Sequence, residues 1–226
     1  MFLELKGIKK VFYNGERVIE VLKEIDLWVE KGEKIAIVGP SGSGKTTLLN
    51  IIGTLDKPTS GELFINGKKI DYEKEEELSL LRRRKIGFVF QFYHLLPELN
   101  VFENLIIPGL IDGLPFGDIE KIGEELLVRL RLSHKKDARV YTLSGGERQK
   151  LAIGRALFLK PELLLADEPT GNLDPESAKE VLQLFLELNK EFNTTLLMVT
   201  HNMEIAKKMD RIYLLKEGFL VEYKKP

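Results

Sequence analysis

Cysteine is absent from this 226-residue sequence. Disulfide bonds, thiolate metal sites and cysteine nucleophiles are therefore excluded, and the composition fits a reducing compartment. Net charge is also nearly absent, because 34 Lys and Arg residues oppose 35 Asp and Glu residues and leave a formal charge of -1. Such a balance gives no overall electrostatic reason to expect nucleic acid or an anionic membrane surface as the main partner.

Long apolar runs are missing as well. Runs such as residues 163–166 are far shorter than the roughly 18 residues that a membrane-spanning helix needs. The first six residues contain both an acid and a base and no apolar signal segment. We therefore expect a cytoplasmic chain, unless something else holds it at a membrane. Its length allows one large domain or a core with an inserted lobe.

The pattern of apolar residues predicts an α/β chain. Residues 3–11 and 18–29 flank Asn14-Gly15, which predicts an antiparallel hairpin. Further strands are predicted over 34–38, 60–67, 86–90, 163–167, 195–200 and 212–215, and helices over 46–52, 119–132, 148–159, 175–189 and 203–209. Pro97, Pro108 and Pro115 mark a loop-rich stretch that opens a helical lobe inserted into the core. Alternating strands and helices favour a largely parallel sheet with its ligand site beyond the carboxyl ends of the strands.

A glycine-rich segment lies between the predicted strand 34–38 and the predicted helix 46–52. It reads Gly39-Pro40-Ser41-Gly42-Ser43-Gly44-Lys45-Thr46 and matches the phosphate-binding P-loop in full. Backbone N–H groups of such a loop turn toward phosphate oxygens, and the helix N-terminus adds positive potential. We expect Lys45 to reach the β- and γ-phosphates, Thr46 to offer its hydroxyl to Mg²⁺, and Thr47 to join the nucleotide-binding residues. An ordinary glycine-rich turn is the alternative.

Two carboxylates, Asp167 and Glu168, end the apolar strand 163–167. A strand end beside a P-loop is where an aspartate directed at Mg²⁺ is expected, so we assign that role to Asp167. Glu168 is then expected to face the water near the γ-phosphate, as general base or water-positioning group. The alternative is a pair of solvated acids.

The segment Ser144-Gly145-Gly146-Glu147 opens a predicted helix. Ser144 and Glu147 have the spacing of a capping box, which is a structural role. The two glycines also leave the helix N-terminus bare enough for a phosphate to approach its N–H groups. Together with the P-loop and the paired carboxylates, this segment favours a role in nucleotide binding.

These motifs together resemble the nucleotide-binding subunits of ABC transporters, over residues 2–218. The sequence is most similar to the branch of lipoprotein-releasing, macrolide-export and cell-division ATPases. The segments that carry this likeness are Asn50-Ile51-Ile52-Gly53, Leu55-Asp56-Lys57-Pro58-Thr59-Ser60-Gly61 and Asp167-Glu168-Pro169-Thr170-Gly171-Asn172-Leu173-Asp174. The resemblance implies one ABC ATPase domain, with a P-loop core and N-terminal antiparallel β subdomain in residues 1–90 and 158–226. A helical subdomain is inserted at about residues 91–157.

The resemblance also implies roles for single residues. Gln91 corresponds to the glutamine that touches Mg²⁺ or the attacking water, and His201 to the histidine that contacts the γ-phosphate. Asp174 corresponds to an aspartate that communicates across a dimer, although Asp174-Pro175 also suits a plain helix N-cap. Phe12 corresponds to the aromatic residue that stacks on adenine. Tyr13 could serve instead, and a core aromatic is a further alternative.

Partners and cofactors follow from the same resemblance. Two copies are expected to pair head to tail around ATP and Mg²⁺, so that Ser144 and Gly146 of one chain close on the ATP held by Lys45 of the other. Integral membrane permease subunits are the expected partners, and the work is expected to be lipoprotein release or a related export or mechanical process. A soluble ABC ATPase of DNA repair or translation and a P-loop small-molecule kinase are the rival functions.

Two features stay outside these motifs. Residues 82–85 form a basic cluster that the acids of 73–77 balance, which favours a solvated face over contact with a phospholipid or a partner. Residues 112–118 are expected to form a loop of the helical lobe and a candidate docking surface.

Overall fold

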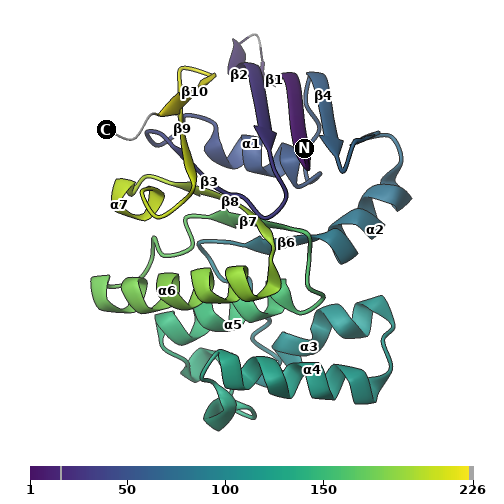
Figure 1. The fold of residues 1–226 in the computed structure, drawn as a ribbon, viewed down its shortest axis with the longest axis vertical. Coiled ribbons are helices and arrows are strands. Elements are labelled where there is room, and N and C mark those ends of the chain that lie inside the picture. The colour runs from purple at the N-terminus through teal and green to yellow at the C-terminus, as the bar shows by residue number, and fades with distance from the viewer. Residues whose placement is uncertain (16, 224–226) are drawn as a thin grey trace. The chain divides into compact units, whose positions relative to one another are not determined.

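The computed structural model describes residues 1–15 and 17–223, which form two compact units (Figure 1). The first unit comprises Met1–Arg82 and the chain from Thr195 onward, and the second comprises Arg83–Thr194. The subdivision with residues 91–157 as an inserted lobe stays a prediction. The boundaries of the two units differ from those of that lobe, because the second unit also includes β6, β7 and α6.

An antiparallel sheet opens the first unit. Strand β1 (Leu3–Asn14) pairs with β2 (Arg17–Val29) and with β4 (Ser60–Ile65), which turns at Asn66-Gly67 into β5 (Lys68–Lys69). The hairpin predicted at Asn14-Gly15 is confirmed, because β1 and β2 pair antiparallel as far as Asn14 and Arg17. This sheet is the predicted N-terminal antiparallel β subdomain.

Parallel strands form the other part of the first unit. Strand β3 (Lys34–Val38) pairs in parallel with β8 (Thr195–Thr200) and β9 (Arg211–Lys216), and β10 (Phe219–Tyr223) returns antiparallel to β9. All six residues of β8 are buried, as expected for a strand covered on both faces. Helices α1 (Lys45–Ile52) and α7 (Met203–Ala206) complete this part. The predicted strands are confirmed, the helix expected to reach residue 209 is shorter, and β10 was not predicted.

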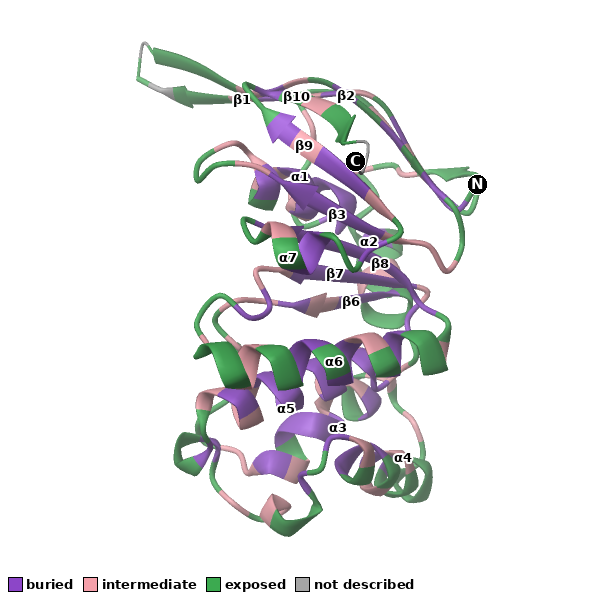
Figure 2. Cartoon of the chain, turned by 60° about the vertical axis from the view of Figure 1, so that its left-hand side comes forward, coloured by how far each residue is buried: buried purple, intermediate pink, exposed green. Residues whose placement is uncertain are grey.

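The second unit is a stack of helices beside a parallel pair of strands. Strand β6 (Ile86–Val89) pairs with β7 (Leu163–Asp167), and α5 (Gly145–Leu157) packs against β6. The remaining helices are α3 (Val101–Asp112), α4 (Phe116–Arg129) and α6 (Pro175–Phe192), with short 3₁₀ turns at Ser133–Lys135 and Val140–Thr142. The layers follow the order α6, α5, α3, α4, and α5 is mostly buried (Figures 1 and 2).

Close packing in this stack depends on glycine. A side chain at Gly154 of α5 would place its Cβ 2.3 Å from a methyl carbon of Leu130. A side chain at Gly109 of α3 would lie 2.5 Å from the ring of Phe158. Helix α5 can therefore approach its neighbours only because these two positions lack a Cβ.

Two sequence predictions need correction, and one helix was not predicted. The stretch expected to be loop-rich contains α3, which continues through Pro108 because Val101, Leu105 and other apolar side chains are buried along it. The loop predicted at 112–118 shrinks to residues 113–115, since α3 ends at Asp112 and α4 begins at Phe116. The basic cluster 82–85 lies at the end of an unpredicted helix, α2 (Glu75–Lys85).

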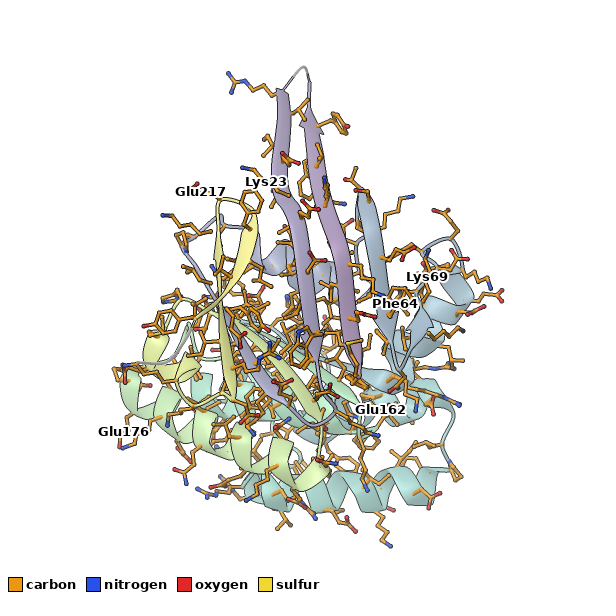
Figure 3. All side chains as sticks on the ribbon, turned by 45° about the horizontal axis from the view of Figure 1, so that its top comes forward. Lys23, Phe64, Lys69, Glu162, Glu176 and Glu217 are labelled. Atoms are coloured by element: carbon orange, nitrogen blue, oxygen red, sulfur yellow. The ribbon has the colours of Figure 1, made fainter. Side chains whose placement is uncertain are left out.

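The surface of both units is built from charged side chains, many of them paired. Lys69 forms an ion pair with Glu62, and the aliphatic stem of Lys23 places its ammonium 5.3 Å from the ring centroid of Phe219. Lys23, Lys69 and Glu176 project from the ribbon in Figure 3. In residues 1–15 and 17–223, no helix is both long and apolar enough to cross a lipid bilayer.

Candidate functional site

The loop between β3 and α1 folds around its own lysine. The Nζ atom of Lys45 donates hydrogen bonds to the carbonyl oxygens of Gly39 and Pro40, each over 2.9 Å, and the side chain is buried. Gly42 and Gly44 adopt φ angles of +76° and +98°, which favour glycine. A Cβ at Gly39 would lie 2.3 Å from the carbonyl oxygen of Leu215. The loop therefore has the tight shape that the sequence predicted for residues 39–46.

This loop also has the polarity that phosphate groups require. Helix α1 has Gly44 at its N-cap, with no side-chain cap and no acidic residue in its first turn, which includes Thr46 and Thr47. The hydroxyl oxygen of Ser43 is buried and has no hydrogen-bond partner in the part of the chain that is described. A helix N-terminus carries partial positive charge on its N–H groups. The predicted residues Gly39, Ser41, Gly42, Ser43, Gly44, Lys45, Thr46 and Thr47 thus form one cradle suited to an anion.

His201 comes to this cradle through the parallel sheet. Val38 and Thr200 are paired positions on the neighbouring strands β3 and β8. Gly39 and His201 are the residues that follow them, and paired strands lie about 4.8 Å apart. The two residues therefore leave the sheet at the same edge, where the P-loop begins.

The register of the first hairpin separates Phe12 from Tyr13. The Nζ atom of Lys10 lies 4.9 Å from the ring centroid of Phe12, so both side chains occupy one face of β1. The hairpin partner of Lys10 is Leu22, and methyl carbons of Val21 and Leu22 lie 2.8 and 3.1 Å from where a Cβ at Gly44 would be. The hairpin therefore passes close to the P-loop at residues 21 and 22, and Phe12 lies on the Lys10 face of β1. Tyr13, one residue further along, is on the opposite face.

The second unit holds the carboxylates. Asp167 is the last residue of β7, and Glu168 follows it with a φ angle of +44°, in the left-handed region that non-glycine residues seldom occupy. The carbonyl oxygen of Glu168 accepts a 2.9 Å hydrogen bond from the N–H of Gly171. This turn makes the chain change direction directly after the strand and sets the direction in which the Glu168 side chain leaves it.

Gln91 is held by a residue that the sequence reasoning did not single out. Its Nε2 donates to Oδ1 of Asn172 over 2.9 Å, and Nδ2 of Asn172 donates to the Gln91 carbonyl oxygen over 3.1 Å. The two residues are 81 positions apart in the sequence. The structure therefore joins the end of β6 to the segment that follows the paired carboxylates.

Three features point to a nucleotide-hydrolysing cassette. They are a P-loop, two carboxylates at a strand end, and a glutamine bonded to the segment that follows those carboxylates. The family model for the ABC transporter matches residues 22–171. The chain belongs to the ABC transporter family. It binds and hydrolyses ATP, and the predicted α/β fold is confirmed.

Relatives of this ABC ATPase span nearly its whole length. It is 51% identical over 219 residues to the lipoprotein-releasing system ATP-binding protein LolD of Aquifex aeolicus, which covers 97% of this chain and 96% of that protein. It is 46% identical to the LolD of Legionella pneumophila (strain Paris), with 97% of each chain covered. Among solved structures, the dimeric ATP-binding cassette MJ0796 bound to ADP and Pi is 40% identical, with a TM-score of 0.89 and 98% of both chains covered.

The helix that carries the Ser144 segment in this ABC ATPase begins with a capping box. The Ser144 hydroxyl accepts from the N–H of Glu147 over 3.2 Å, and a Glu147 carboxylate oxygen accepts from the N–H of Ser144 over 2.8 Å. The backbone hydrogen bond from Ser144 lowers the pKa of the Glu147 carboxyl. The predicted capping box is therefore formed. Ser144 is exposed, whereas Gly145 is half-buried and Gly146 is buried beside Ser177, so within this unit the open part of the α5 N-terminus is at Ser144.

Asp174 has its structural role as well. Its carboxylate accepts from the N–H groups of Glu176 and Ser177 over 3.1 and 3.0 Å, and Pro175 occupies the first helical position of α6. Hydrogen bonds from Ser177 lower the pKa of the Asp174 carboxyl. The N-cap that the sequence offered as one alternative is therefore formed.

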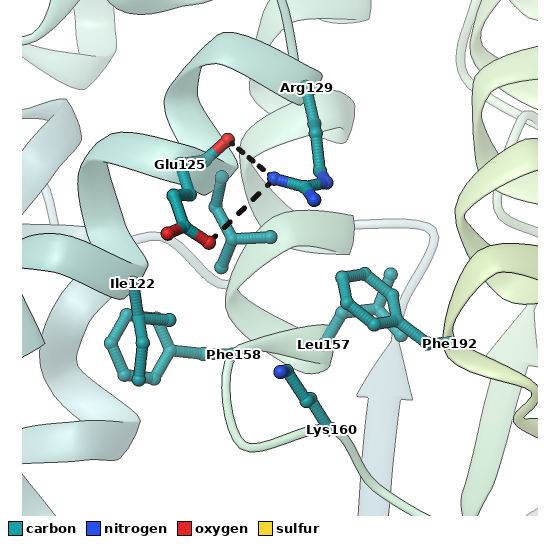
Figure 4. A pocket seen from close by; sticks show the side chains of 8 residues that line it. Ile122, Glu125, Arg129, Leu157, Phe158, Lys160 and Phe192 are labelled. Carbon is teal, nitrogen blue, oxygen red and sulfur yellow. Dashed lines mark hydrogen bonds and ion pairs between the residues drawn. The ribbon is translucent and has the colours of Figure 1, made fainter. Parts of the chain in front are cut away.

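A hollow elsewhere in the second unit does not fit a nucleotide. It is lined by residues from α4, α5 and the end of α6, including Ile122, Phe158 and Phe192 (Figure 4). Its volume of about 50 Å³ is roughly a third of the 150 Å³ cavity that holds a benzene molecule. The nucleotide-binding assignment therefore depends on the P-loop and not on this hollow.

Proposed function

We propose that this chain is the ATP-hydrolysing subunit of a lipoprotein-releasing system and that it works as a head-to-tail dimer. The observation that carries this proposal is the 51% identity to a LolD protein over 97% of the chain, which includes the P-loop and the paired carboxylates. A dimeric cassette among the similar structures supports the pairing. No comparison supports a soluble ABC ATPase of DNA repair or translation.

The residues divide into two sets with different tasks. The set of the first unit binds the nucleotide: Phe12 stacks on adenine, the P-loop and Lys45 hold the phosphates, and His201 contacts the γ-phosphate. The set of the second unit carries out hydrolysis: Glu168 orients or deprotonates the attacking water, and Gln91 positions it. Ser144, Gly145, Gly146 and Asp174 act on the nucleotide held by the second copy.

Mg²⁺ is proposed to be held by Thr46, Asp167 and Gln91. Their hydroxyl, carboxylate and carboxamide oxygens are the hard donors that this ion prefers, so the residues fit it. When bound, the ion would neutralise charge on the phosphate oxygens. The residues of the chain then have only to align the water with the γ-phosphate and to accept its proton.

Membrane subunits are the proposed partners. Two chains closing around ATP and separating after hydrolysis produce motion, which a permease at the inner face of the membrane would convert into release of its substrate. We therefore propose a cytoplasmic position, peripheral to the membrane through those subunits. No role for nucleic acid is proposed.

Reconstitution tests the proposed function. The chain would be co-expressed with permease subunits encoded beside its gene, purified as a complex and placed in liposomes that carry a triacylated lipoprotein. We expect ATP-dependent release of the lipoprotein to a soluble acceptor, and no release by a complex with Glu168→Gln. ATPase activity without release would assign the chain to another branch of the family.

Adenine stacking gives a prediction that separates two adjacent aromatic residues. Phe12→Ala should weaken binding of ATP and GTP alike, by about 0.5 to 1.5 kcal/mol, because stacking uses the ring face more than a hydrogen-bonding edge. Tyr13→Ala, on the opposite face of the strand, should leave both affinities unchanged. Calorimetric titration of the two variants measures this. A loss of affinity in Tyr13→Ala alone would transfer the role to Tyr13.

A further inference from the structure

The loop that follows Gln91 is held in an unusual conformation. His94 has a φ angle of +50°, and its ring stacks on that of Phe90 with the centroids 4.7 Å apart. A non-glycine residue in this region costs of order 1 kcal/mol or more and persists only where its surroundings enforce it. The turn therefore needs a partner that fixes its backbone.

Arg155, in the last turn of α5, is that partner. One guanidinium nitrogen donates to the carbonyl oxygen of His94 over 2.8 Å, and another donates to the carbonyl oxygen of Tyr93 over 3.0 Å. The planar guanidinium can grip two successive carbonyl groups at once, which an ammonium group cannot do with the same geometry. The two hydrogen bonds thus fix the backbone of the turn at both residues.

Nothing in the described residues neutralises this cation. No carboxylate among them pairs with Arg155, and burial lowers the pKa of its guanidinium. A half-buried charge with only neutral acceptors is an expensive way to fill space, and an apolar side chain would fill it at lower cost. This argues that Arg155 is used to hold the loop rather than to stabilise the core.

The loop at residues 91–94 contacts segments next to residues proposed to act in hydrolysis. Gln91 exchanges two hydrogen bonds with Asn172, four residues after Glu168. At the other end of α5, the hydroxyl of Tyr93 lies 3.3 Å from where a Cβ at Gly145 would be. Residues 91–94 therefore contact the segment after β7 and both ends of α5.

We propose that Arg155 is a positioning residue for ATP hydrolysis, which fixes the turn at Tyr93 and His94 and thereby the place of the Gln91 carboxamide. Its guanidinium acts through the carbonyl oxygens of Tyr93 and His94. The proposal rests on the proposed role of Gln91, because Arg155 acts only through that residue.

A double-mutant cycle tests this inference. Arg155→Gln should lower kcat for ATP about tenfold while KM changes less than about twofold, since misplacing a group around the reacting atoms slows chemistry without weakening nucleotide binding. The kcat of Arg155→Lys should lie between those of the parent protein and Arg155→Gln, because lysine keeps the charge and loses the two-pronged hydrogen bonding. In a Gln91→Ala background, Arg155→Gln should have little further effect. Arg129→Gln, on α4 and paired with Glu191, is the matched control and should leave kcat unchanged.

The possible outcomes separate the two proposals. Independent, multiplicative losses from Gln91→Ala and Arg155→Gln, or a loss in Arg155→Gln that appears only in KM, would overturn the role of Arg155. A normal kcat in Arg155→Gln with a reduced kcat in Gln91→Ala would also overturn it and leave Gln91 in place. A normal kcat in Gln91→Ala would remove Gln91 from catalysis and the positioning proposal with it. Circular dichroism melts of each variant identify any loss that comes from unfolding.

Discussion

Glu168→Gln should reduce ATP hydrolysis by about 10² or more and leave ATP binding intact, because the amide cannot orient or deprotonate water as a carboxylate does. The substitution is well matched to the structure. Glu168 occupies the left-handed region at φ +44°, and glutamine has the same branching and length, so the backbone cost is the same in both proteins. The effect therefore reports on the carboxylate alone. Steady-state ATPase rates and nucleotide titration measure the two quantities.

With hydrolysis blocked, ATP should hold two chains together. We expect a monomer of 25.8 kDa without nucleotide and a dimer with ATP, measured by light scattering on Glu168→Gln. Adding Ser144→Arg should abolish the dimer, because it places bulk and charge at the exposed start of α5. If Ser144→Arg leaves the dimer unchanged, the shared site is wrong.

A control for this series lies in the same unit. Glu176 is an exposed acid in the first turn of α6, and Glu176→Gln changes the charge by the same amount eight residues from Glu168. Its ATPase rate should match that of the parent protein. A rate for Glu168→Gln equal to that of Glu176→Gln would remove the general-base role from Glu168.

Features with a local signature were predicted from the sequence. The Asn14-Gly15 hairpin depends on turn chemistry between alternating strands, and the strand, loop and helix around Lys45 depend on a short apolar run next to glycines. The capping box at Ser144 depends on a spacing of three residues. Each of these patterns lies within about twenty residues of chain, so neighbouring residues contain all the information.

Features that depend on tertiary contacts were not predicted. Helix α3 runs through Pro108, because burial of its apolar face outweighs the preference of proline for a helix end. Strand β10 has mostly exposed side chains and forms by pairing with β9. Its own sequence has no apolar alternation that would predict it. The bonds from Gln91 to Asn172 and from Arg155 to Tyr93 join residues 81 and 62 positions apart. Side-chain contacts over such separations leave no pattern in the sequence.

Lys45→Ala should abolish ATPase activity and weaken ATP binding about 10- to 100-fold, because a hydrogen bond to a charged group contributes roughly 1.5 to 3 kcal/mol. The structure adds a second reason for a large effect. The ammonium of Lys45 closes the loop on the carbonyl oxygens of Gly39 and Pro40, and its loss would also leave the cradle less well formed before the nucleotide arrives.

Calorimetric titration with ATP and with adenosine shows whether Lys45 acts on the phosphate groups. Adenosine carries no phosphate, so its affinity should be the same for Lys45→Ala and for the parent protein, whereas the affinity for ATP should fall. Lys69→Ala removes an exposed lysine of the same unit that pairs with Glu62, and it should change neither affinity. Undiminished ATP affinity in Lys45→Ala would remove the P-loop assignment, since no other lysine or arginine lies within residues 39–46 to replace the lost charge.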